Sequence, residues 1–106
     1  MDTIMALSLE LLQATRVLLE RCQQGELDAL APLQEEREKL VAALDHESQQ
    51  SYPRDVLVGC RSLLNETQAL EQQALHILER QRDEAGKAFQ KMKAAEKARK
   101  AYDRFS

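Results

Sequence analysis

The sequence predicts an all-α protein, an elongated antiparallel helical bundle of three long helices followed by a short C-terminal helical segment. Good helix formers (Ala, Leu, Glu, Gln, Lys and Arg) dominate the 106 residues. The chain lacks the runs of β-branched residues and the Asn-Gly or Asp-Gly turns that signal strands and hairpins. Apolar residues recur at steps of three and four, which places them on one helical face. Long helices bury such faces by packing side by side, so we expect a single domain over residues 1–106.

The first two helices are predicted from their apolar faces and their end signals. The first helix is expected over residues 3–22, because Gly25 can adopt the left-handed conformation that ends a helix. The second is expected over residues 27–45, with Pro32 in its first turn, where a missing N–H costs little. Arg37 interrupts the apolar face of this second helix. Two interpretations stay open: its charged end reaches solvent, or it makes a buried polar contact that fixes the helix register.

The third helix carries the longest apolar stripe in the chain. Pro53 can start it, and the spacing predicts a helix over residues 54–93, with a short fourth segment over 94–105. Gly86 is a candidate kink within this range. The stripe begins with Leu, Ile and Val and continues mainly with Ala, Met and Gln flanked by Lys and Arg. A leucine-rich face builds a core, whereas the thinner basic face is better suited to a partner.

Charge is distributed unevenly along the chain. Residues 1–50 hold ten acids and four bases, a net charge of −6, and residues 51–106 hold eight acids and eleven bases, a net charge of +3. The basic end could fold onto the acidic body or bind an acidic partner. Base stacking needs aromatic platforms, which are few here, so we expect no direct binding of nucleic acid. No stretch approaches the roughly 20 apolar residues of a membrane span.

Residues that could support catalysis or hold a metal do not form a recognisable pattern. Cys22 and Cys60 are far apart in the sequence and fall on or beside apolar helical faces, which is typical of small core residues. His76 is followed by Glu79, but the Glu-x-x-His motif of bundle metal sites does not occur. We therefore expect no enzymatic activity, no cofactor and no metal. The first ten residues lack the basic start of a secretory signal, which predicts a cytoplasmic protein.

Several segments, in the same order and spacing, resemble the FliT family of flagellar export chaperones. The end of the first helix and start of the second match in residues 21–30, which include Gly25-Glu26-Leu27-Asp28 where the family has Gly-Glu-Trp-Asp. Residues 64–70 and 80–84 resemble the long third helix of that family, and residues 100–106 resemble its Ala-Tyr-containing C-terminal helix. Each motif is weak alone, but together they cover nearly the whole chain.

The resemblance implies a small cytosolic helical bundle that binds the C-terminal region of the flagellar filament-cap protein, FliD, and prevents its premature assembly. It also implies contacts with export-gate and ATPase-complex components of type III flagellar secretion. In some members the chaperone is also a negative regulator that binds the flagellar master transcription activator. A C-terminal helix covers the binding surface in such members.

The candidate partner-binding surface lies on the second half of the third helix and beyond it. Leu75 stands beside the apolar stripe, so packing in the core and lining a groove are both open for it. Two alternatives to the chaperone hypothesis also stay open: a basic-tailed nucleic-acid or regulatory module, and a plain homodimerising helical protein. The residues expected to contact or gate the partner are Leu70, Leu75, Leu78, Gln81, Tyr102 and Phe105.

Overall fold

The computed structural model describes residues 2–81, 86, 90 and 92. Within them the chain forms three long helices, α1 (Thr3–Gln24), α2 (Leu30–Glu47) and α3 (Arg54–Arg80), and one short 3-10 helix, η1 (Leu27–Ala29). The described residues include no strand, in agreement with the predicted all-α class. The predicted segment 94–105 lies outside the described residues.

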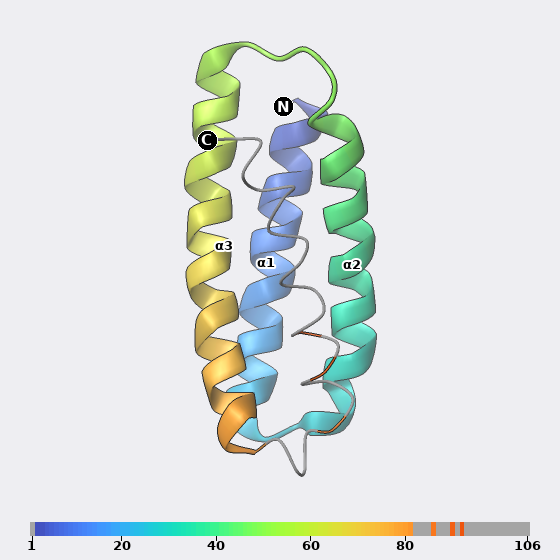
Figure 1. Cartoon of the computed structure of the whole chain (residues 1–106), viewed down its shortest axis with the longest axis vertical. Coiled ribbons are helices and arrows are strands. Elements are labelled where there is room, and N and C mark those ends of the chain that lie inside the picture. The colour runs from blue at the N-terminus through green and yellow to red at the C-terminus, as the bar shows by residue number, and fades with distance from the viewer. Residues whose placement is uncertain (1, 82–85, 87–89, 91, 93–106) are drawn as a thin grey trace.

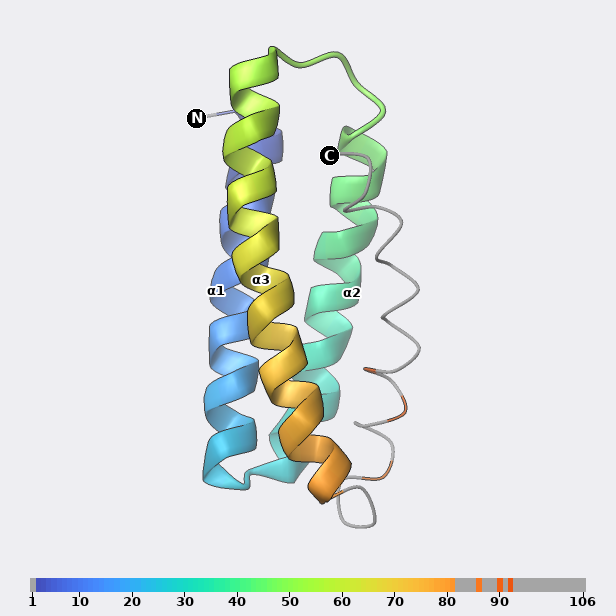
Figure 2. The same cartoon turned by 60° about the vertical axis from the view of Figure 1, so that its left-hand side comes forward.

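The helices run side by side along a molecule that measures 44 × 20 × 20 Å (Figure 1). α1 and α3 run in the same direction, and α2 runs opposite to both (Figures 1 and 2). α1 packs against both other helices, whereas the backbones of α2 and α3 come close at few points. α1 therefore forms the spine of the bundle, and side chains must fill the space between α2 and α3.

α1 ends at Gln24, two residues beyond the predicted bound of residue 22, and the turn after it shows why Gly25 stops the helix. Gly25 has φ 71°, and its N–H donates to the Cys22 carbonyl at 3.2 Å. The N–H of Glu26 donates to the Arg21 carbonyl at 3.0 Å. These two bonds form a Schellman motif, which satisfies carbonyls that the helix end leaves unpaired. The predicted second helix, 27–45, is in fact the 3-10 turn η1 followed by α2, since such tighter turns are common at helix starts.

The third helix ends earlier than its apolar spacing indicated. α3 stops at Arg80 rather than at residue 93, and Gln81 already has φ −119°. Gly86 has φ 47°, which no right-handed helix accommodates, so residues 54–93 do not form one unbroken helix. Gln90 and Met92 are again helical, and the Gln90 N–H donates to the Gly86 carbonyl at 3.3 Å. Periodicity did not reveal this break, because the apolar spacing resumes after it.

The core consists of two apolar clusters, one at each end of the bundle. The η1-end cluster lies near η1 and the C-terminal end of α3, and its buried members are Leu18, Leu19, Cys22, Leu30, Ala74, Leu75, Leu78 and Met92. The loop-end cluster lies near the connection between α2 and α3, and its buried members are Ile4, Leu11, Leu44, Cys60 and Leu64.

Between the two clusters, every long helix contributes polar side chains. We call this set the polar layer; it comprises Thr15 of α1, Gln34 and Arg37 of α2, and Thr67 and Glu71 of α3. Arg37 is only 3% exposed, so the interpretation that its charged end reaches solvent is wrong. The alternative interpretation, a buried polar contact, describes its position.

Candidate partner-binding site

The leucines that sequence reasoning singled out lie in or against the η1-end cluster. Leu75 and Leu78 are buried members of it, and Leu70 packs against it while partly buried. In this conformation Leu75 and Leu78 therefore act as core residues, and a partner could reach them only if something that covers them moved. Tyr102 and Phe105 lie outside the described residues.

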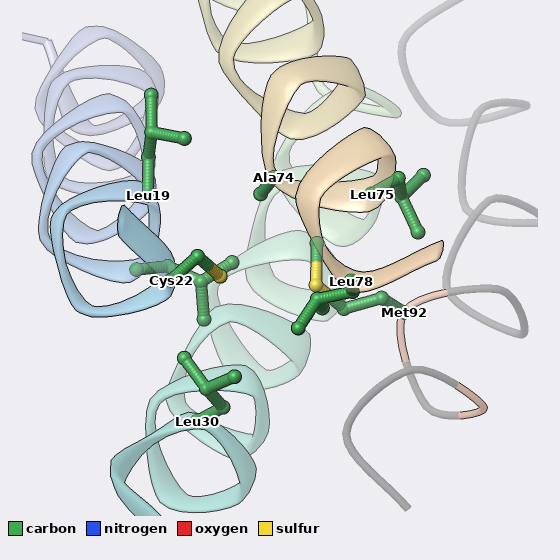
Figure 3. Packing of buried hydrophobic residues seen from close by; sticks show 8 residues of the cluster. Leu19, Cys22, Leu30, Ala74, Leu75, Leu78 and Met92 are labelled. Atoms are coloured by element: carbon green, nitrogen blue, oxygen red, sulfur yellow. The ribbon is translucent and has the colours of Figure 1, made fainter. Parts of the chain in front are cut away.

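Among the described residues beyond the end of α3, Met92 is the one that packs into the η1-end cluster. It is 3% exposed and belongs to the η1-end cluster, although α3 ends at Arg80 and the chain turns at Gly86 before reaching it. Figure 3 shows Met92 beside Leu78, opposite the side chains that α1 and α2 contribute. Sequence reasoning placed Met92 on the apolar stripe but not among the site residues. The sequence did contain a signal for this contact: beyond Gly86, the large apolar residue Met92 continues the three- and four-residue apolar spacing.

Gln81 ends α3 beside this cluster and carries an unpaired buried atom. Its backbone N–H donates to the Leu78 carbonyl at 3.1 Å. Its side-chain oxygen Oε1 is buried and accepts no hydrogen bond from any residue that the structure describes. A buried acceptor without a donor costs about 1–3 kcal/mol, so this conformation includes a local penalty at the edge of the site.

The polar layer borders the η1-end cluster and has well-defined hydrogen bonds. Arg37 Nε donates to Thr15 Oγ1 at 2.9 Å, and one terminal nitrogen donates to Gln34 Oε1 at 2.7 Å. The other terminal nitrogen forms an ion pair with Glu71, which joins α2 to α3. The guanidinium thus binds side chains from all three helices.

The chemistry of the remaining side chains is that of a packed core. Burial raises the pKa of the Cys22 thiol to about 11, which keeps it protonated and unreactive at neutral pH. Burial also raises the pKa of Cys60. Across the described part of the chain, no three His, Cys, Asp or Glu side chains converge as metal ligands would. A shallow hollow of about 400 Å³ lies over residues 25–29, and one of its lining residues, Leu27, packs against the η1-end cluster.

None of the described helices combines the length and the apolar content that crossing a bilayer requires. The arrangement instead offers leucines on α3, covered by a methionine from beyond a turn, which suits binding of another helix in place of that methionine.

Comparison with models of known protein families identifies a match. The family model described as flagellar protein FliT matches residues 5–104, which is almost the whole chain. A search of curated proteins and a search of solved structures found no match. The match agrees with the resemblance seen in residues 21–30 and in the later segments. The chain therefore belongs to the FliT family of flagellar proteins, a family of flagellar chaperones.

Proposed function

We propose that this protein is a cytoplasmic export chaperone that binds the C-terminal region of the flagellar filament-cap protein and prevents its assembly before secretion. The family provides the general role of a flagellar chaperone. The observation that supports a partner site on α3 is the burial of Met92 beside Leu78, in the cluster that also contains Leu75 (Figure 3). An amphipathic client helix would displace Met92 and place its own apolar residues on these leucines.

Competition between Met92 and the client would set the affinity. When only a fraction of a protein is in the binding-competent state, the apparent dissociation constant equals the intrinsic constant divided by that fraction, so binding is weaker. An export chaperone benefits from this, because its client must leave again. The unpaired Gln81 oxygen would favour exchange as well, since a client N–H or O–H group could supply the missing donor.

Calorimetric titration with a C-terminal fragment of the filament-cap protein tests the proposal. Met92→Ala should tighten binding about tenfold or more, because truncating a buried methionine weakens the closed state by about 2–5 kcal/mol and about 1.4 kcal/mol corresponds to tenfold. Val58→Ala, on an exposed position of the same helix bundle, is the matched control and should leave binding unchanged. Absence of binding to the fragment would refute the proposed client, and unchanged or weaker binding by Met92→Ala would refute the competition.

The same purified chain discriminates the alternatives. Export-gate and ATPase-complex components, and the master transcription activator, are further partners that the family resemblance implies, and pull-downs with each component test them. A nucleic-acid module would lose affinity steeply with salt, because phosphate contacts release counterions. Sedimentation measurements over a range of concentrations test the homodimer.

A further inference from the structure

Along each long helix, the residues of the polar layer lie between the residues of the two apolar clusters. Along α1, Thr15 separates Leu11 of the loop-end cluster from Leu18 of the η1-end cluster. Along α2, Gln34 and Arg37 lie between Leu30 and Leu44. The two clusters therefore share no buried member, although they lie on the same three helices.

On α3, Thr67 and Glu71 likewise lie between Leu64 and Ala74. Two of the layer's hydroxyls are also bonded within their own helices. Thr15 Oγ1 donates to the Leu11 carbonyl at 2.7 Å, and Thr67 Oγ1 donates to the Leu63 carbonyl at 2.9 Å. The layer thus contributes directional hydrogen bonds where the rest of the core contributes apolar contact.

Apolar packing couples neighbouring turns because each side chain touches several others, and loss of one loosens the rest. A layer of hydrogen-bonded polar side chains interrupts that chain of contacts. Its own bonds need not break when the apolar cluster on one side opens. The layer is therefore a natural boundary between two cooperative units of local opening.

We propose that the polar layer divides the bundle into two units that open separately, with the η1-end unit opening while the loop-end unit stays folded. The η1-end cluster includes Met92, which reaches it from beyond the turn at Gly86, whereas the loop-end cluster is built from α1, α2, α3 and the connection at Tyr52. Loss of the Met92 contact loosens one unit only. The link from this opening to client binding rests on the proposed function, but the two-unit opening does not.

The chain contains one reporter in each unit. Cys22 lies in the η1-end cluster and Cys60 in the loop-end cluster, and both are free and buried. Burial raises the pKa of both thiols, so in the folded state they react slowly with alkylating reagents near neutral pH. Labelling of each thiol therefore measures the opening of its own unit.

The experiment is pulsed thiol alkylation of the full chain at pH 8, followed by mass spectrometry. Cys60→Ala isolates Cys22, Cys22→Ala isolates Cys60, and each rate is divided by the rate of the same thiol in urea-unfolded chain. We expect Cys22 to be labelled about tenfold or more faster than Cys60, as for a local opening compared with global unfolding. Low urea should accelerate Cys60 more than Cys22, because global unfolding exposes more surface. Equal rates with equal urea dependence would overturn the two-unit opening.

A paired apolar variant tests whether the polar layer is the boundary. Arg37→Met combined with Glu71→Met would join the two clusters through apolar contact, so the Cys22 rate should fall towards the Cys60 rate. A Cys22-to-Cys60 ratio unchanged from wild type would overturn the role of the layer. If this variant does not fold, Thr15→Val provides the same test on α1. Because no client is present, failure of these results is distinguishable from failure of the chaperone proposal.

Discussion

Removing the guanidinium of Arg37 should be among the most damaging single changes in this bundle. Arg37 is 3% exposed and binds Thr15, Gln34 and Glu71, so it holds side chains from three helices. Arg37→Met keeps most of the aliphatic volume and removes the charge and its hydrogen bonds. The variant therefore isolates the polar contribution from the packing of the stem.

The expected loss in the free energy of unfolding follows from the burial of the Arg37–Glu71 ion pair. Breaking a buried ion pair by removing one partner costs about 3–5 kcal/mol. The side chain of Glu71 is 16% exposed, so water can solvate its carboxylate in part, and we expect a value near 3 kcal/mol, at the low end of that range. This is a large share of the roughly 5–15 kcal/mol that stabilises a typical domain.

Urea unfolding followed by circular dichroism measures the loss. The matched control is Arg16→Met, because Arg16 pairs with Glu66 at 2.8 Å between α1 and α3 while the side chains are 54% and 51% exposed. An exposed pair contributes about 1 kcal/mol or less. If Arg37→Met costs no more than Arg16→Met, the assignment of a stabilising buried network is wrong.

The double variant sharpens the same test. Replacing a buried ion pair by apolar residues of similar size is often neutral or stabilising. Arg37→Met with Glu71→Met should therefore be more stable than Arg37→Met alone. Additive losses from the two substitutions would contradict a direct interaction between the two side chains.

The remaining predictions concern four further positions. Leu78→Ala should lower the free energy of unfolding by about 2–5 kcal/mol in urea titration; a loss below about 1 kcal/mol would contradict its core position. Gly25→Ala should cost about 1 kcal/mol, because φ 71° is left-handed and no neighbouring atom lies within 4 Å of the added methyl, and a stabilising effect would refute the assigned turn. Gln81→Met should raise the midpoint of thermal unfolding by removing the unpaired acceptor, and a lower midpoint would contradict the assigned penalty. Raising the pH from 9 to about 11 should destabilise wild type more than Cys22→Ala. Folding raises the pKa of the Cys22 thiol from 9.0 to about 11. The stability due to the protonated thiol is therefore complete below pH 9 and is lost as the pH passes the folded pKa. An equal fall of the urea midpoint in the two proteins between pH 9 and pH 11 would contradict it.

The sequence by itself determined the helical class, the start of α3 after Pro53 and the end of α1 at Gly25. These features depend on local chemistry: helix propensity, the fixed φ of proline and the tolerance of glycine for positive φ. The segments that resemble the FliT family are likewise recognisable in the order of the residues alone. Local features of the sequence were therefore sufficient to predict the fold class and the family.

Only the tertiary structure decided which side chains meet. Periodicity placed Arg37 on an apolar face but left open whether its charge reached water, because that depends on the helix packed opposite. Periodicity also continued through Gly86 and so concealed the turn that brings Met92 back onto Leu78. Apolar spacing reports which face of a helix is buried; contact between distant segments is set by three-dimensional packing, which a one-dimensional pattern does not contain.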